Sequence, residues 1–92
     1  MVVTNARDLG RLIRRERRDR QMSQSQLCAA AGVSRTWLSE FEAGKPTAEL
    51  GRVFEVINAL GLAMTVAPAP NPEIDLDDVL RAYTQRPDVS HG

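Results

Sequence analysis

The sequence has very little of what a disulfide, a metal site or an active site needs. Its 92 residues include one cysteine, Cys28, and one histidine, His91, which lies near the C-terminal end. A single cysteine cannot form an internal disulfide, so we expect a small core residue in a reducing compartment. The sequence has no cysteine–histidine cluster, no glycine-rich phosphate loop and no pair of acids placed for catalysis. We therefore expect a protein that is not an enzyme and that needs no metal or other cofactor.

Long hydrophobic runs are also missing. No stretch approaches the roughly 18 apolar residues of a membrane span. The first ten residues, MVVTNARDLG, do not combine the basic start and the apolar stretch of a secretory signal. These absences predict a cytoplasmic protein with no membrane partner.

The chain has no net charge, but its charges are unevenly distributed. Residues 1–62 carry ten basic and seven acidic side chains, whereas residues 63–92 carry two basic and five acidic ones. A basic head and an acidic end suggest two different partners. A chain of this length forms one small domain with a modest core, so dimerisation is plausible from size alone.

Apolar residues at helical spacing predict four short helices. We expect them over residues 5–21, 23–32, 34–44 and 47–60. Ser23 and Gln26 form a capping box, Ser34 is an N-cap, and Gly32 follows the end of the second helix. The fourth helix has an apolar face that consists of Leu50, Val53, Phe54, Ile57 and Leu60.

After residue 62 the pattern changes to alternation, which predicts a short strand. The strand comprises Ala63, Met64, Thr65, Val66 and Ala67. Because the chain offers no convincing second strand, either this strand pairs with its copy in another subunit or the assignment is wrong. The expected organisation is a domain over 5–62, a dimerising strand over 63–67, and a linker and flexible tail over 68–92. The proline-rich start of that tail precedes a possible amphipathic helix that contains Leu76, Val79, Leu80 and Tyr83.

Residues 23–44 have the spacing of two helices that cross steeply around a tight turn. Cys28 is small enough for the closest approach, and Gly32 allows the chain to turn. The apolar residues that would lock the two helices together are Leu27, Ala31, Val33, Leu38 and Phe41. This combination predicts a helix-turn-helix that binds DNA.

The run MSQSQLCAAAGVSRTWLSEFEAGKPT resembles the helix-turn-helix of the Xre family, which includes the lambdoid phage repressors and Cro. The resemblance covers about residues 7–62. The continuation VFEVINALGLAMTVAP resembles HipB-type antitoxins of toxin–antitoxin systems. It implies a mostly α, lambda-repressor-like bundle of four short helices, with a C-terminal strand that pairs across a homodimer.

In this arrangement the third helix lies in the major groove, with its outer face toward the bases. Since Leu38 and Phe41 face inward, the residues expected to contact bases are Arg35, Thr36, Ser39 and Glu40. Arg35 can bond a guanine through O6 and N7, and Thr36 can contact a thymine methyl group. Glu40 either accepts from a cytosine amino group or orients Arg35.

Three further residues are expected to contact phosphates. The resemblance assigns Gln24 to this role, and Lys45 follows the third helix directly. Ser34 is either a simple N-cap or also a phosphate ligand. Seven arginines between residues 7 and 20 either form a solvated surface or add long-range attraction to DNA.

Two other assignments concern packing. Trp37 either packs beside the helix pair or at a dimer contact, or it stacks on bases. Arg17 and Glu42 match a pair that links the first and third helices in the phage-repressor relatives, which implies a structural ion pair.

Two functions fit the sequence. One is a HipB-like antitoxin that represses its own operon and neutralises a HipA-like serine/threonine kinase toxin. The alternative is a stand-alone dimeric Xre-family repressor with no toxin partner. The strand and the acidic end favour the antitoxin, because a simple repressor does not need them. Both require operator DNA and a second copy of the chain.

Overall fold

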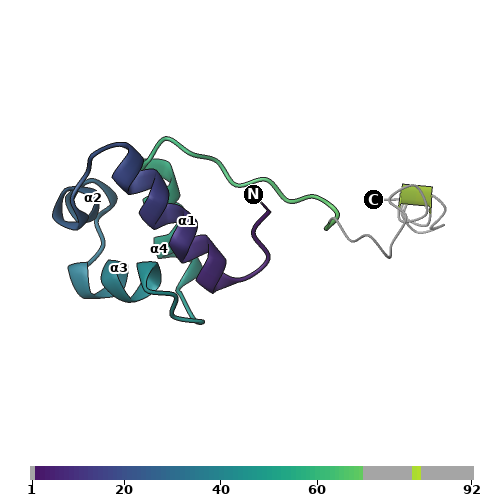
Figure 1. The fold of residues 1–92 in the computed structure, drawn as a ribbon, viewed down its shortest axis with the longest axis horizontal. Coiled ribbons are helices and arrows are strands. Elements are labelled where there is room, and N and C mark those ends of the chain that lie inside the picture. The colour runs from purple at the N-terminus through teal and green to yellow at the C-terminus, as the bar shows by residue number, and fades with distance from the viewer. Residues whose placement is uncertain (1, 70–79, 82–92) are drawn as a thin grey trace.

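The computed structural model describes residues 2–69 and 80–81. Its body consists of four helices: α1 (Ala6–Asp19), α2 (Gln24–Ala31), α3 (Arg35–Glu42) and α4 (Leu50–Ala59). α2 packs on α3 and α4, and α1 packs on α3 (Figure 1). The described chain is mostly helical, as predicted, and the first three helices begin and end within two residues of their expected bounds.

Local hydrogen bonds explain where α2 and α3 begin and end. The Ser23 hydroxyl accepts from the Gln26 backbone N–H at 3.0 Å, while the Ser23 N–H donates to the Gln26 side chain at 2.8 Å. The Ser34 hydroxyl accepts from the Trp37 N–H at 3.1 Å. Gly32 follows α2 with a φ of 73°, a conformation that costs glycine little. The predicted capping box, N-cap and turn glycine are therefore confirmed.

All four helices contribute to one small hydrophobic core. Its buried members are Ile13, Leu27, Cys28, Ala31, Leu38, Phe41, Val53, Val56, Ile57 and Leu60. Partly buried residues such as Leu9, Val33 and Trp37 pack against its edge. The core therefore ties the α2–α3 pair to α1 and α4.

The prediction for α4 was wrong in two respects. The helix begins at Leu50 rather than Thr47, and its buried face is narrower than its apolar face. Leu50 and Phe54 are 61% and 41% exposed, whereas Val56, absent from the prediction, is fully buried. The buried residues of this helix are Val53, Val56, Ile57 and, at its C-cap, Leu60. At 3.6 residues per turn these four share one stripe, and Leu50 and Phe54 lie beside it.

The crossing of α1 over α3 depends on a glycine. A Cβ atom at Gly10 would collide with the carbonyl oxygen of Phe41 and lie 2.9 Å from its carbonyl carbon. Gly10 is buried, so no solvent gap is available for a side chain. The two backbones therefore approach each other as closely as only glycine permits.

Residues 62–69 leave the helical body without forming a helix or a strand within the chain (Figure 1). The strand predicted at 63–67 is expected to pair with a second subunit, and a single chain cannot show that pairing. The pairing therefore stays a prediction. The predicted tail helix falls outside the described residues, apart from Leu80 and Arg81.

Candidate nucleic-acid interface

α2 and α3 are fixed to each other by a short turn and by shared core packing. The backbone N–H groups of Gly32 and Val33 both donate to the Cys28 carbonyl, at 2.8 and 3.2 Å. Leu27 of α2 and Leu38 of α3 are fully buried in the same cluster. This rigid pair sets the direction in which the outer face of α3 points.

The outer face of α3 carries the four residues predicted to contact bases. Arg35, Thr36, Ser39 and Glu40 are all exposed. Leu38 and Phe41, from the same helix, are buried at 0% and 1% exposure. The four polar residues are therefore accessible to a ligand, and their contacts with bases stay a prediction.

Arg35 leans back toward the start of α2. Its Nε lies 3.5 Å from the Gln24 side-chain oxygen, and its Nη1 donates to the Ser25 hydroxyl at 3.2 Å. Glu40 instead binds the Lys45 ammonium, at 3.0 Å. In the structure without DNA, Glu40 therefore does not orient Arg35, which has its partners on α2, and the role of Glu40 toward bases stays a prediction.

A buried ion pair lies behind this face. Arg17 donates to both carboxylate oxygens of Glu42, at 2.8 and 2.9 Å, and also to the Met22 carbonyl at 2.7 Å. The two charged side chains are only 9% and 2% exposed. The hydrogen bond to Glu42 raises the pKa of Arg17 above its ordinary value, although burial opposes this. The ion pair that the resemblance implied is present, and it links α1 to α3.

Gln24 connects the ion pair to the outer face. Its side-chain nitrogen donates to Glu42 at 3.2 Å, and its oxygen faces Arg35. The amide is thus held in one orientation by a buried carboxylate on one side and by a cation on the other. Such anchoring limits the conformations from which Gln24 can meet a phosphate.

The other two predicted phosphate contacts flank α3. Ser34 precedes the helix and uses its hydroxyl as the N-cap, while the exposed Lys45 follows the helix. Together with Gln24 they surround the two ends of the exposed α3 face. Their contact with phosphates stays a prediction.

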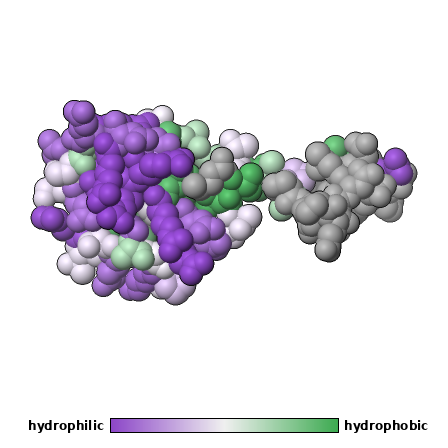
Figure 2. Space-filling model, viewed as in Figure 1, coloured by the Kyte–Doolittle hydropathy of each residue, from purple (hydrophilic) through white to green (hydrophobic). Residues whose placement is uncertain are grey.

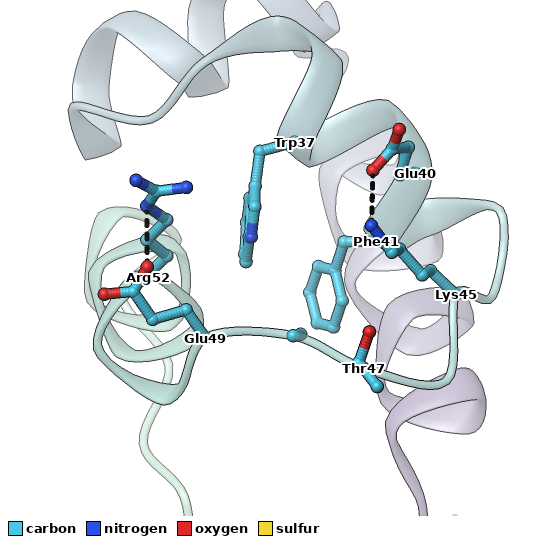
Figure 3. A pocket seen from close by; sticks show the side chains of 8 residues that line it. Trp37, Glu40, Phe41, Lys45, Thr47, Glu49 and Arg52 are labelled. Carbon is cyan, nitrogen blue, oxygen red and sulfur yellow. Dashed lines mark hydrogen bonds and ion pairs between the residues drawn. The ribbon is translucent and has the colours of Figure 1, made fainter.

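Trp37 packs rather than projecting freely toward a ligand. Its ring stacks on Phe41 with centroids 5.1 Å apart and an angle of 27° between the planes. Both rings line a cavity of about 300 Å³ between α3 and the start of α4 (Figure 3). Two ion pairs flank this cavity, Glu40–Lys45 at 3.0 Å and Glu49–Arg52 at 3.3 Å. Of the earlier alternatives, the structure supports packing of Trp37 beside the helix pair.

A second, larger concavity is apolar. It measures about 670 Å³ and lies among residues 2–6, α1, α4 and residues 62–69. The predicted strand forms one wall, with Met64 and Val66 41% and 92% exposed. Figure 2 shows hydrophobic residues gathered where this segment leaves the otherwise hydrophilic body.

The described residues contain no group of three or more histidine, cysteine or acidic side chains that could hold a metal ion. Over the same part of the chain, no helix has the length and apolar character needed to cross a membrane.

Residues 8–68 match the helix-turn-helix domain family. The chain belongs to this family. A relative from Sinorhizobium fredii (strain NBRC 101917 / NGR234), the uncharacterized HTH-type transcriptional regulator y4mF, is 37% identical over 59 residues. The match covers 64% of this chain and 78% of the relative. The helix-turn-helix protein is therefore a DNA-binding regulator and not an enzyme.

Solved structures show the same fold. The chain of a HipB–O4 20mer complex superposes on the helix-turn-helix protein with a TM-score of 0.71 at 23% identity. The chain of a HipA–HipB–O2–O3 complex does so with a TM-score of 0.71 at 21% identity. Each comparison covers 76% of this chain and 99% of the other. The HipB-like fold implied by the sequence is confirmed.

Sequence reasoning missed two contributors to these surfaces. Ser25 holds Arg35, a contact that depends on how α2 and α3 cross rather than on any motif. Val2 and Val3 line the apolar concavity, and their adjacency at the start of the chain was the available signal.

Proposed function

We propose that this protein is a dimeric repressor that binds a specific operator and acts as a HipB-like antitoxin. The observation that carries the DNA-reading part is the exposed face of α3, which offers Arg35, Thr36, Ser39 and Glu40 on a rigid helix pair. A helix that enters the major groove with its N-terminal turn first would present Arg35 to a guanine. Arg35 would then exchange its contacts with α2 for contacts with the base.

Dimerisation is supported by the apolar concavity. A second copy that binds there would cover the exposed Val66 side chain. It would also give the predicted strand at 63–67 a strand to pair with. A symmetric dimer would place two α3 helices on the two halves of a pseudo-palindromic operator. Where that operator lies in the promoter of the protein's own operon, the bound dimer would repress the operon.

The antitoxin part rests on the likeness to HipB. The matched region makes up 76% of this chain, which is more than residues 5–62 alone, so the likeness extends beyond the helix-turn-helix domain. One of the similar chains comes from a complex that contains HipA as well as DNA. We accordingly propose a HipA-like serine/threonine kinase toxin as the second partner, which this protein binds and neutralises.

The alternative is a stand-alone repressor with no toxin partner. The name of the relative y4mF, a transcriptional regulator, favours this function. In that case residues 68–92 serve dimerisation or a different purpose.

A comparison of two tagged proteins in the native host separates the two functions. One is the full chain, and the other ends at Ala67; captured partners are identified by mass spectrometry and tested for kinase activity. The antitoxin function predicts that a kinase is captured with the full chain and that excess protein inhibits its phosphorylation activity. Loss of the kinase on truncation would assign the contact to the tail. Capture of DNA and of the protein's own copy alone would favour the stand-alone repressor.

A further inference from the structure

A polar crevice of about 390 Å³ opens beside α3. It differs in lining residues and in charge from the cavity that Trp37 lines. It lies between α1, the start of α2 and α3. Arg14 and Arg18 contribute from α1, and Ser39 contributes from the exposed face of α3. The buried pair Arg17–Glu42 also lines it. An occupant of this crevice would therefore lie directly beside the residues proposed to read bases.

The crevice carries uncompensated positive charge. Arg17 and Glu42 neutralise each other through two hydrogen bonds. Arg14 and Arg18 are exposed, and within the described residues no hydrogen bond or ion pair occupies either side chain. The crevice thus has two positive charges with no carboxylate to balance them, a setting that favours an anion.

The Trp37 cavity differs in this respect. Its two cations, Lys45 and Arg52, are each paired with a glutamate of the same cavity (Figure 3). That cavity is therefore balanced in charge. In contrast to that cavity, the crevice with Arg14 and Arg18 offers an excess of donors to an anion.

The donors are also suitably arranged. Arg14 and Arg18 are four residues apart, so their side chains share one face of α1 and reach the same volume. The Arg17 guanidinium has five N–H groups, and three hydrogen bonds join it to Glu42 and Met22. The other two N–H groups make none of these bonds, and the Arg17 side chain that carries them lines the crevice.

We propose that this crevice binds a backbone phosphate of the DNA duplex, with Arg14 and Arg18 as its principal ligands. The inference rests on the proposed DNA binding and adds two residues to the expected contacts Gln24, Ser34 and Lys45. With α3 in the major groove, a phosphate beside the groove would enter the crevice next to Ser39. The two arginines contribute affinity and register, and they carry no base preference.

The test compares two double variants of equal charge. Arg14→Gln/Arg18→Gln empties the crevice of free cations, whereas Arg11→Gln/Arg15→Gln removes two exposed arginines of the same helix that do not line it. Binding of each full-length protein to a short random-sequence duplex is measured over a series of salt concentrations. All four positions are exposed, and thermal unfolding checks that both variants fold like the wild type.

The crevice variant is expected to lose affinity on the order of tenfold at low salt, and its slope of log K against log salt should become shallower by about one to two. The control pair should change both quantities much less. Equal losses in the two variants would mean a diffuse positive field and would overturn the inference, as would unchanged binding of the crevice variant. If the wild type itself shows no salt-dependent binding, the proposed DNA binding fails first.

A second measurement locates the phosphate. In a duplex that the wild type has selected, single phosphates are replaced by neutral methylphosphonates. One position should weaken the wild type and leave the crevice variant unaffected, because the contact has already been removed. Losses that are additive at every position would contradict a defined phosphate contact.

Discussion

Arg17 of α1 and Glu42 of α3 form a two-point ion pair with almost no exposure to solvent, at 2.8 and 2.9 Å. The same carboxylate accepts a hydrogen bond from Gln24, and the same guanidinium donates to the Met22 carbonyl. One pair therefore joins α1 and α3 and also holds the loop after α1 and the start of α2. Its energetic importance follows from burial, since either charge left alone would be poorly solvated.

Replacing one partner of this pair should destabilise the fold strongly. Arg17→Met leaves Glu42 as an unpaired buried charge and is expected to lower the free energy of unfolding by about 3–5 kcal/mol. Denaturant unfolding followed by circular dichroism measures the change. Arg20→Met is the control, because it breaks the partly exposed Glu16–Arg20 pair and should cost well under 1 kcal/mol. Similar costs for the two variants would show that the buried pair contributes no more than a surface pair.

The contact between Gly10 and Phe41 leads to a second stability prediction. Gly10→Ala adds a methyl group where α1 meets the α3 backbone, so the helices must separate, at a cost of about 1–3 kcal/mol or more. Gly51→Ala is the matched control, since nothing lies within 4 Å of its added Cβ. Gly51 is exposed in the first turn of α4, where this change should stabilise the fold by up to about 0.5–1 kcal/mol. Melting curves of the two variants should therefore shift in opposite directions, and a neutral Gly10→Ala would contradict the close approach.

The apolar concavity predicts the oligomeric state. Met64→Asp together with Val66→Asp places two charges on the strand that is proposed to pair between subunits, and should convert dimers into monomers. Analytical ultracentrifugation measures the result. Thr65→Asp with Ala67→Asp is the control of equal charge on the alternate face of the strand, and should weaken the dimer less. A dimer that survives the first pair of changes would disprove the shared strand.

Cys28 predicts a dependence of stability on alkaline pH. Burial raises the pKa of its thiol above the ordinary value of 9.0, with the charge of Arg35 opposing this more weakly. A thiol whose folded pKa is raised stabilises the fold fully below its unfolded pKa, and this contribution is lost as pH rises through the folded pKa. The free energy of unfolding should therefore fall more steeply above about pH 9 in the wild type than in Cys28→Ala. Parallel pH profiles would show that the thiol is not involved.

The α2–α3 unit was predictable because its signals are local. The hydrogen bonds that begin and end these helices join residues three or four positions apart, and they involve Ser23, Gln26, Gly32 and Ser34. Capping chemistry alone therefore places the two helices and their turn. Leu38 and Phe41 are three residues apart on the buried side of α3, and their positions then determine which side of the helix faces outward.

Features that depend on contacts between helices were not predictable in this way. The apolar residues of α4 form a face wider than the stripe that α2 can cover, so Leu50 and Phe54 remain exposed while Val56 is buried. The need for glycine at position 10 arises only when α1 crosses α3. In the same way, Arg35 found its partners on α2 and not on its own helix.

Gln24 and Arg35 should differ in how they affect DNA recognition. Gln24→Ala removes a phosphate donor and is expected to weaken binding to all duplexes by a similar factor. Arg35→Ala should cost about 1–3 kcal/mol on the preferred duplex and relax discrimination at one base position. Competition binding with single-base variants of the preferred duplex measures both. A sequence-selective loss in Gln24→Ala would contradict its assignment to a phosphate.

The most direct test of the central claim is selection of duplexes from a random pool by the wild-type protein and by Arg35→Ala. If α3 reads operator DNA from a symmetric dimer, the wild type will enrich an inverted repeat whose half-sites are about 10–10.5 base pairs apart, or a multiple of that spacing. The Arg35→Ala protein will then enrich the same repeat with one position in each half-site relaxed. Enrichment of no sequence by the wild type, or an unchanged preference in Arg35→Ala, would contradict the proposal that the exposed face of α3 reads the operator.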